Sequence, residues 1–138
     1  MRKERSYGII ALQKSSTFWN ILLIQHTSSL HWAFPKGRPE VGEAPLDTAI
    51  RELKEETGLN VVKLLLNAPF TEEYRFFRKG VETHKQVDYY LAEVEGELEI
   101  CPQEIVQASW QSFADAKHVL TYPESIRVLS TVESFLHT

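Results

Sequence analysis

The sequence predicts an α/β protein, a single-domain α/β/α sandwich with a central mixed β-sheet. Two observations carry this prediction. Segments with the apolar, β-branched composition of strands lie both before and after one strongly patterned helix, and another patterned helix closes the chain. This order implies a sheet covered by helices on both faces. The 138 residues, 43% of them hydrophobic and 25% charged, suit one such domain over residues 1–138.

The first half of the chain predicts two strands, a long loop and a helix. The strands are expected at Tyr7–Leu12 and Asn20–Gln25, on either side of a polar turn. A loop rich in Trp, Pro and Gly follows from Ser28 to Gly42. The helix is expected over Pro45–Thr57, because proline suits the first helical turn and Gly58 suits the left-handed residue that follows a helix.

The expected helix has two different faces. One carries an apolar stripe that can pack on the sheet, formed by Leu46, Ala49, Ile50 and Leu53. Glu52, Glu55 and Glu56 lie three and four residues apart, so their carboxylates share another face. Like charges this close repel one another unless a cation lies among them, and a divalent metal is the simplest such cation. Taken alone, the run RELKEE is more typical of a solvated, ion-paired helix face than of a metal site.

The second half predicts four more strands and two more helices. The strands are expected at Val61–Leu66, Tyr74–Phe77, Lys85–Val94 and Val106–Trp110. The helices are expected at Ser112–Leu120 and Glu124–Leu136. The last helix can turn one apolar face inward, formed by Ile126, Leu129, Val132 and Leu136.

Composition and charge limit the possible function classes. Cys101 is the single cysteine and no Cys/His set has zinc spacing, which fits a reducing cytoplasm. No segment has the pattern of an export signal or the length of a membrane span, so we expect neither export nor insertion. The net charge of −4 and the pI near 5.7 argue against a broad nucleic-acid surface. We expect a cytoplasmic protein, with a monomer favoured.

The acidic helix belongs to a longer pattern, G-x5-E-x7-R-E-U-x-E-E-x-G-U, where U is a bulky aliphatic residue. All nine defined positions are present: Gly37, Glu43, Arg51, Glu52, Leu53, Glu55, Glu56, Gly58 and Leu59. Such a match should arise by chance less than about once in a million chains of this length. The segment resembles the Nudix box. The resemblance implies a Nudix-type fold and the Mg²⁺- or Mn²⁺-dependent hydrolysis of a nucleoside diphosphate linked to another moiety.

The residue types of the box suit this chemistry. Magnesium prefers oxygen ligands and keeps several waters, so a few carboxylates plus substrate phosphates can hold it. Glu52, Glu55 and Glu56 would bind one or more ions that neutralise the pyrophosphate and lower the pKa of an attacking water. Arg51 is expected to orient Glu43 or a neighbouring glutamate rather than to contact substrate.

Residues outside the box suggest a subgroup. The motif HWAFPKG, the strands YGIIAL and YYLAEV, and the pattern of Gln103, Glu104 and Trp110 resemble the asymmetrical diadenosine tetraphosphate hydrolases of the Nudix family. The resemblance covers most of the chain and implies cleavage of the tetraphosphate bridge into ATP and AMP. It also implies phosphate contacts for His31, Lys36 and Lys85, an adenine contact for Trp32, and a role for Glu104 as metal ligand or general base.

Simpler interpretations stand beside these roles. Lys36, His31 and Glu104 can be ordinary solvated loop residues, and Trp32 can pack in the core.

The chain also departs from the subgroup at two places. Where those enzymes commonly offer a tyrosine as a second platform for adenine, this chain places Phe76, with Tyr74 nearby, and both can equally be core residues. Arg38 stands where animal members commonly carry histidine, and it can favour a longer polyphosphate or face solvent.

Other functions remain open. Within the same chemistry, the substrate can be the 5′ end of an RNA or a nucleoside triphosphate, although the negative net charge argues against RNA. A non-catalytic nucleotide-binding sensor is expected to lose one or more metal-binding glutamates, and none is missing here. The acidic helix can also be a plain interaction surface, in which case magnesium neither binds nor stabilises the fold.

Overall fold

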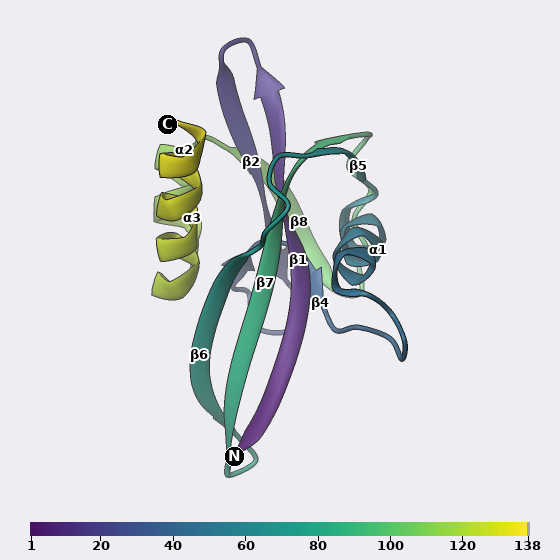
Figure 1. Cartoon of the computed structure of the whole chain (residues 1–138), viewed down its shortest axis with the longest axis vertical. Coiled ribbons are helices and arrows are strands. Elements are labelled where there is room, and N and C mark those ends of the chain that lie inside the picture. The colour runs from purple at the N-terminus through teal and green to yellow at the C-terminus, as the bar shows by residue number, and fades with distance from the viewer. Residues whose placement is uncertain (138) are drawn as a thin grey trace.

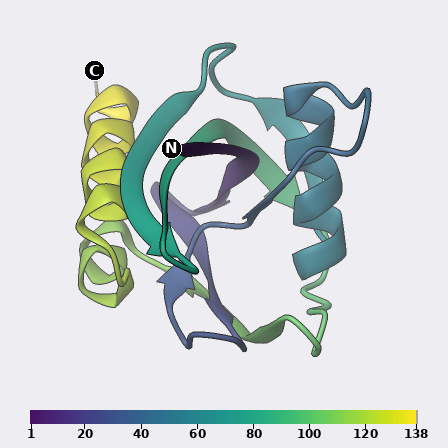
Figure 2. The same ribbon diagram turned by 90° about the horizontal axis from the view of Figure 1, so that it is seen from below.

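Eight strands form one curved, mixed β-sheet with helices packed against both faces (Figure 1). The computed structural model describes residues 1–137. Helix α1 (Pro45–Thr57) lies on one side of the sheet, and α2 (Phe113–Val119) and α3 (Pro123–Leu136) lie on the other, as the view from below also shows (Figure 2). The predicted α/β/α sandwich is confirmed, and Thr138, the last residue of the expected domain, lies outside the described residues.

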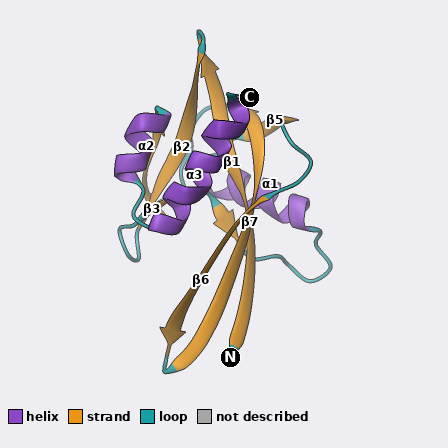
Figure 3. Ribbon diagram, turned by 60° about the vertical axis from the view of Figure 1, so that its left-hand side comes forward, coloured by secondary structure: helices purple, strands orange, loops and turns teal. Residues whose placement is uncertain are grey.

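The sheet is built around one parallel pair of strands. Its strands are β1 (Arg2–Ser15), β2 (Phe18–His26), β3 (Trp32–Ala33), β4 (Lys36–Gly37), β5 (Asn60–Leu64), β6 (Phe70–Arg78), β7 (Val81–Glu95) and β8 (Ile105–Gln111). The order β3-β2-β1-β7-β5 runs through the sheet, while β4 pairs with β1, β6 with β7 and β8 with β2. β1 and β7 are parallel, and the other pairs in the described chain are antiparallel. The lower parts of β1, β6 and β7 form a twisted extension of the sheet (Figure 3).

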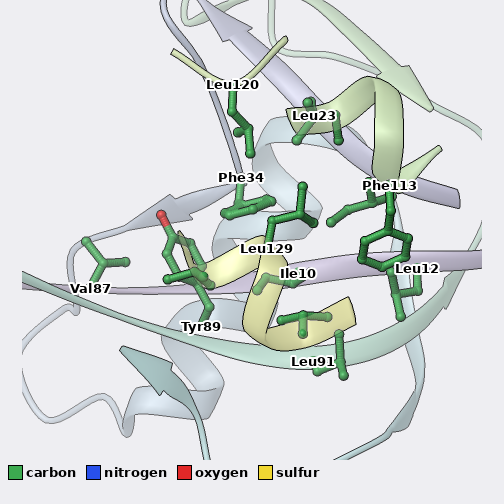
Figure 4. Packing of buried hydrophobic residues seen from close by; sticks show 14 residues of the cluster. Ile10, Leu12, Leu23, Phe34, Val87, Tyr89, Leu91, Phe113, Leu120 and Leu129 are labelled. Atoms are coloured by element: carbon green, nitrogen blue, oxygen red, sulfur yellow. The ribbon is translucent and has the colours of Figure 1, made fainter. Parts of the chain in front are cut away.

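Buried side chains form one hydrophobic cluster on each face of the sheet. Successive residues of β1 point to opposite faces, so Ile9 joins the cluster under α1 while Ile10 joins the cluster under α2 and α3. Leu129 of α3 packs with Ile10 and Leu91 in the second cluster (Figure 4). Burial on both faces explains why β1 and β2 are continuous apolar runs.

Helix α1 has the predicted bounds. Pro45 occupies its first turn, and Gly58 ends it in the left-handed conformation, with φ of 78° and an N–H that donates to the Lys54 carbonyl. Ala49 and Leu53 of the apolar stripe are fully buried against the sheet. This packing fixes the direction in which the acidic face points.

The predicted strand ends were wrong by several residues. β1, β6 and β7 extend well beyond the expected segments, because pairing along the twisted extension also holds polar residues such as Glu4 and Lys85 in strands. The expected loop from Ser28 to Gly42 contains two short strands, β3 and β4, of two residues each. β5 ends at Leu64, because the chain leaves the sheet there to reach β6. None of the helices within residues 1–137 is long and apolar enough to cross a membrane.

Candidate active site

Arg51 connects the acidic residues of α1 to the loop before the helix. Its Nε and Nη2 donate to the two carboxylate oxygens of Glu43 at 2.8 and 2.9 Å, which is the bidentate geometry typical of an arginine–carboxylate pair. Nη1 donates to Glu52 at 2.9 Å and to Glu55 at 3.2 Å, and Nη2 also donates to the Arg38 carbonyl at 3.0 Å. The bonds from Arg51, with one from Thr48, lower the pKa of Glu43 to about 2. Arg51 therefore orients its neighbours and does not project toward solvent.

Gly37 allows the Glu52 carboxylate to lie directly against β4. A Cβ at this position would lie 2.0 Å from the Glu52 carboxyl carbon and 2.3 and 2.4 Å from its two oxygens. Those distances are far shorter than a van der Waals contact, so no larger residue fits without moving Glu52. The glycine of the motif thus serves close packing between the β4 loop and α1.

Glu56 is the most buried carboxylate of the acidic face, with 3% of its surface exposed. One of its oxygens accepts a hydrogen bond from the Lys36 backbone N–H at 3.1 Å. Burial is the largest cause that raises the pKa of Glu56 to about 8; the charges of Glu52 and Glu104 also raise it, and Lys36 opposes them. Without a cation, this carboxyl is largely neutral at pH 7.

Glu104 reaches the same cluster from another part of the chain. It lies immediately before β8, and its charge raises the pKa values of both Glu52 and Glu56. For Glu52 the largest cause of the raised pKa is burial, which Arg51 partly offsets. The charges of Glu55 and Glu104 both raise the pKa of Glu52, so the fold brings all four predicted metal-binding carboxylates close enough to influence one another's charge.

A pocket of about 450 Å³ opens on the other side of Lys36. Its lining comes from β3, β4, β6, β7 and the start of α3 and comprises His31, Ala33, Lys36, Glu72, Tyr74, Arg75, Phe76, Arg78, Tyr89, Tyr122, Glu124 and Ser125. The rings of Tyr74 and Phe76 lie 5.9 Å apart, and the Arg78 guanidinium lies over the Phe76 ring at 5.1 Å. The volume and this mixture of aromatic and basic side chains suit a small anionic ligand with a flat ring.

His31 is held at one edge of this pocket. Its ring stacks on His26 at 4.5 Å and lies 5.5 Å from the ring of Tyr122. Burial lowers the pKa of His31, and the Lys36 charge lowers it further. The same causes, with His31 itself, lower the pKa of His26 to about 4. Both imidazoles are therefore neutral at pH 7 and can offer a hydrogen bond rather than a charge.

A buried carboxylate, Glu4, gathers the basic side chains beyond the pocket. It forms ion pairs with Arg38 and with Arg78, the latter at 2.7 Å, and its second oxygen lies 4.0 Å from Lys85 Nζ. Lys85 is only 6% exposed, donates to Ser6 at 2.5 Å and, mainly because of burial, has its pKa lowered to about 8. Glu4 thus partly neutralises the positive charges of Arg38, Arg78 and Lys85.

The sequence profile of the NUDIX domain matches residues 2–131. The chain belongs to the Nudix family. The rat (Rattus norvegicus) asymmetrical bis(5′-nucleosyl)-tetraphosphatase is 30% identical over 141 residues, which cover 96% of this chain and 95% of the rat protein. The mouse (Mus musculus) protein of the same name is 32% identical over 130 residues, which cover 93% of this chain and 87% of the mouse protein. A solved C. elegans Ap4A hydrolase has a TM-score of 0.74 and 26% identity and covers 99% of both chains.

The acidic face of this Nudix domain fits a divalent cation, the kind of ion that the family generally uses. Carboxylate oxygens are suitable ligands, and because burial raises the pKa values of Glu52 and Glu56, a cation among them would stabilise their charged forms. In residues 1–137, however, no three Asp, Glu, His or Cys side chains are gathered as closely as ligands around one ion. Arg51 holds Glu52 and the exposed Glu55, so binding would require these side chains to turn.

The structure separates the predicted substrate-binding residues of the Nudix domain into two groups. His31, Lys36 and Phe76 line the pocket together. Lys85 and Arg38 instead face Glu4, and Trp32 packs against the hydrophobic cluster under α2 and α3. These three residues are not part of the pocket lining.

Several residues at the site were missed by the sequence analysis. Tyr122 faces His31 across the pocket, Arg78 covers Phe76, and Glu72 and Ser125 lie at its inner end. They lie in β6 and at the start of α3, outside any motif. One signal was available for Tyr122. Pro123 marks the start of the last helix, so Tyr122 could be placed at the N-terminal end of that helix.

Proposed function

We propose that this Nudix domain hydrolyses dinucleoside polyphosphates, chiefly diadenosine tetraphosphate, to ATP and AMP. The observation that carries the proposal is the position of Lys36 between the acidic face and the aromatic pocket. Its backbone N–H donates to Glu56, and its side chain lines the pocket. A nucleotide whose base lies in the pocket therefore has its phosphates next to Lys36 and directed toward the glutamates. The names of the rat and mouse relatives support the same substrate.

The pocket would hold one adenine of the substrate. Tyr74, Phe76 and Tyr122 offer ring faces on which a base can stack. His31 and Lys36 would contact the phosphates that follow, His31 as a neutral hydrogen-bond donor and Lys36 as a point charge. Trp32, Arg38 and Lys85 would act only indirectly in this arrangement, since they lie outside the pocket.

Glu52, Glu55 and Glu56 would hold Mg²⁺ or Mn²⁺, with Glu104 as a further ligand or as the base that takes a proton from the attacking water. The cation, when bound, would supply charge neutralisation on the polyphosphate and a lowered pKa for its bound water. Arg51 would keep Glu52 oriented through the bonds it makes to both Glu52 and Glu43. Glu104 suits proton removal because its carboxylate is exposed and lies near Glu52 and Glu56.

Product analysis tests the proposal. Incubating the purified chain with magnesium and diadenosine tetraphosphate should release ATP and AMP in equal amounts, and Glu56→Gln should abolish turnover. Two molecules of ADP, or no turnover, would contradict it. A panel with nucleoside triphosphates and 5′-triphosphorylated RNA distinguishes the other substrates. If the parent never turns over and Glu56→Gln binds nucleotide equally well, the domain is a sensor.

The aromatic pocket can be tested with a matched pair of variants. Phe76→Ala should raise the KM for diadenosine tetraphosphate about tenfold or more, because stacking on a base contributes roughly 1–3 kcal/mol. Phe77→Ala is the control, since Phe77 follows on the same strand but is 72% exposed and does not line the pocket. Equal KM values for the two variants would place the adenine elsewhere.

A further inference from the structure

The inner end of the aromatic pocket holds an acid that neither phosphate binding nor hydrolysis explains. Glu72 on β6 lines the pocket although only 5% of its surface is exposed. The Ser125 hydroxyl at the start of α3 donates to its Oε2 at 2.9 Å. The other carboxylate oxygen, Oε1, has no hydrogen-bond partner among residues 1–137. One oxygen is thus held in place while the other is available to a ligand.

A second buried polar group lies beside this acid. The Tyr89 hydroxyl is fully buried and has no hydrogen-bond partner within the described chain. Its ring packs edge-on against Phe34 at 5.1 Å, and its hydroxyl oxygen lies at the end of the ring that points away from Leu91 (Figure 4). Tyr89 also lines the pocket, and the nearby Glu72 charge raises its pKa further after the larger effect of burial. A buried hydroxyl without a partner is unfavourable, so a ligand that supplied one would be favoured.

We propose that Glu72 and Tyr89 recognise the base by its hydrogen-bonding edge and select adenine. Glu72 accepts a hydrogen bond from the exocyclic 6-amino group, and the Tyr89 hydroxyl donates to the neighbouring ring nitrogen. An acceptor beside a donor matches this edge of a 6-aminopurine. A 6-oxopurine in the same pose places a carbonyl oxygen against the Glu72 carboxylate, which can only accept, so it loses that bond, while the Tyr89 hydroxyl would have to rotate and accept from the ring N–H.

This inference rests on the proposed function, because it assumes that the base lies in this pocket. The rival explanation is structural: Glu72 would only anchor β6 to α3 through Ser125. The two explanations differ in a measurable way. Anchoring predicts that changes at Glu72 lower stability without altering the preference among bases, whereas recognition predicts that the preference itself changes.

Binding of mononucleotides to the metal-free chain gives the decisive comparison. Isothermal titration calorimetry should show AMP binding about tenfold more tightly than IMP or purine riboside 5′-monophosphate, which lacks the 6-amino group. In Glu72→Gln, Ser125 should retain the amide oxygen and leave the NH₂ group facing the base. The preference for AMP over IMP should then fall to about one or reverse.

Two further variants complete the test. Glu73→Gln makes the same chemical change at the next residue of β6, which is exposed and does not line the pocket, and it should keep the parental preference. Tyr89→Phe removes the unpaired hydroxyl while preserving shape, and it should also lower the AMP-to-IMP preference. Tyr89→Phe tests base recognition even if the Glu72→Gln variant fails to fold.

The outcomes separate this inference from the proposed function. Parental AMP-to-IMP ratios in the folded Glu72 and Tyr89 variants would overturn base recognition, even if the chain cleaves diadenosine tetraphosphate. Altered ratios without any turnover of diadenosine tetraphosphate would support recognition and overturn the proposed reaction. Equal binding of the three nucleotides to the parent would overturn recognition at once.

Discussion

Arg51 shows how a single side chain can organise several acids before any metal binds. Its guanidinium contacts Glu43, Glu52 and Glu55 together, and it also donates to the backbone of the loop at Arg38. The bonds to Glu43 raise the already high pKa of Arg51, so its charge is permanent. Repulsion within the acidic face is thereby relieved on one side, while Glu56 remains buried without a charged partner at hydrogen-bond distance.

Gly37 offers a direct test of this close packing. In Gly37→Ala, the new methyl group would overlap the Glu52 carboxylate, so we expect activity and magnesium affinity to fall tenfold or more while the fold persists. Gly80→Ala is a suitable control. Its Cβ meets nothing within 4 Å, although its φ of 78° should cost about 1 kcal/mol of stability. Equal activities of the two variants, measured at saturating magnesium and by magnesium titration, would contradict the role of Gly37.

Glu56 is one group through which pH should act on the stability of the metal-free chain. Its pKa rises from 4.5 to about 8 on folding, so between these values the folded chain holds a proton that the unfolded chain has released. At this group the folded state then binds more protons, so the contribution of Glu56 to the free energy of unfolding must fall as pH rises toward 8. We expect Glu56 to contribute a loss on the order of 3 kcal/mol, measured by denaturant unfolding from pH 5 to 8.5.

Glu56→Gln isolates this contribution. The variant lacks the titrating group, so its metal-free form should lose less stability over the same pH range, and the difference between the two chains cancels the other titrations. Magnesium should restore the parental chain at pH 8 and have little effect on the variant. Parallel stability curves for the two chains would show that Glu56 does not titrate in this range.

Residue identities in the box were predictable, but contacts across the sheet were not. The motif places Gly37, Arg51 and Glu56 by sequence spacing alone. The ion pair of Lys85 with Glu4 and the packing of Trp32 against the hydrophobic cluster under α2 and α3 were not predictable, because contacts between distant strands decide which side a side chain faces. Such contacts depend on strand register, which sequence spacing does not contain.

Helix α1 combines structural and functional faces in thirteen residues. Its apolar stripe was predictable from a helical repeat, and so was its end at Gly58. The ends of the strands were less predictable, because pairing with a neighbour extends a strand past its apolar part. The two-residue strands β3 and β4 carry no periodic signal at all, although β4 contributes Lys36 and Gly37 to the site.

Leu53→Ala tests how far the acidic face depends on packing of α1. Leu53 is fully buried, so the variant should lose about 2–5 kcal/mol in denaturant unfolding. Magnesium affinity should fall as well, since the cavity lets the helix move relative to β4. Val62→Ala on β5 is the matched control, because Val62 is 54% exposed and should change stability by no more than about 0.5 kcal/mol. A stable Leu53→Ala chain with parental magnesium affinity would contradict this dependence.

The molecule as folded is held together by its apolar layers rather than by its acidic face. Two clusters of apolar side chains, one on each face of the sheet, hold the layers together. No group of carboxylates in the described chain is shared between layers as a structural metal site would be.

Removal of divalent cations should therefore stop turnover without unfolding the chain. Treatment with EDTA should abolish hydrolysis of diadenosine tetraphosphate while the far- and near-ultraviolet circular dichroism spectra stay native at 25 °C. Added magnesium should restore activity at once. Loss of the near-ultraviolet signal on chelation would instead indicate that folding depends on the metal, as in zinc-dependent domains.

The parallel pairing of β1 with β7 has a consequence for the N-terminal end of the chain. The pairing runs without interruption from Arg2 opposite Thr83 to Leu12 opposite Glu93, and it sets Glu4 beside Lys85. A slip of two residues would keep each side chain on its own face yet move Glu4 by roughly 7 Å along the strand. Arg38 and Arg78 would then lose their shared carboxylate. Trimming the first four residues would remove Glu4 and so leave Arg38, Arg78 and Lys85 without their shared carboxylate beside the aromatic pocket.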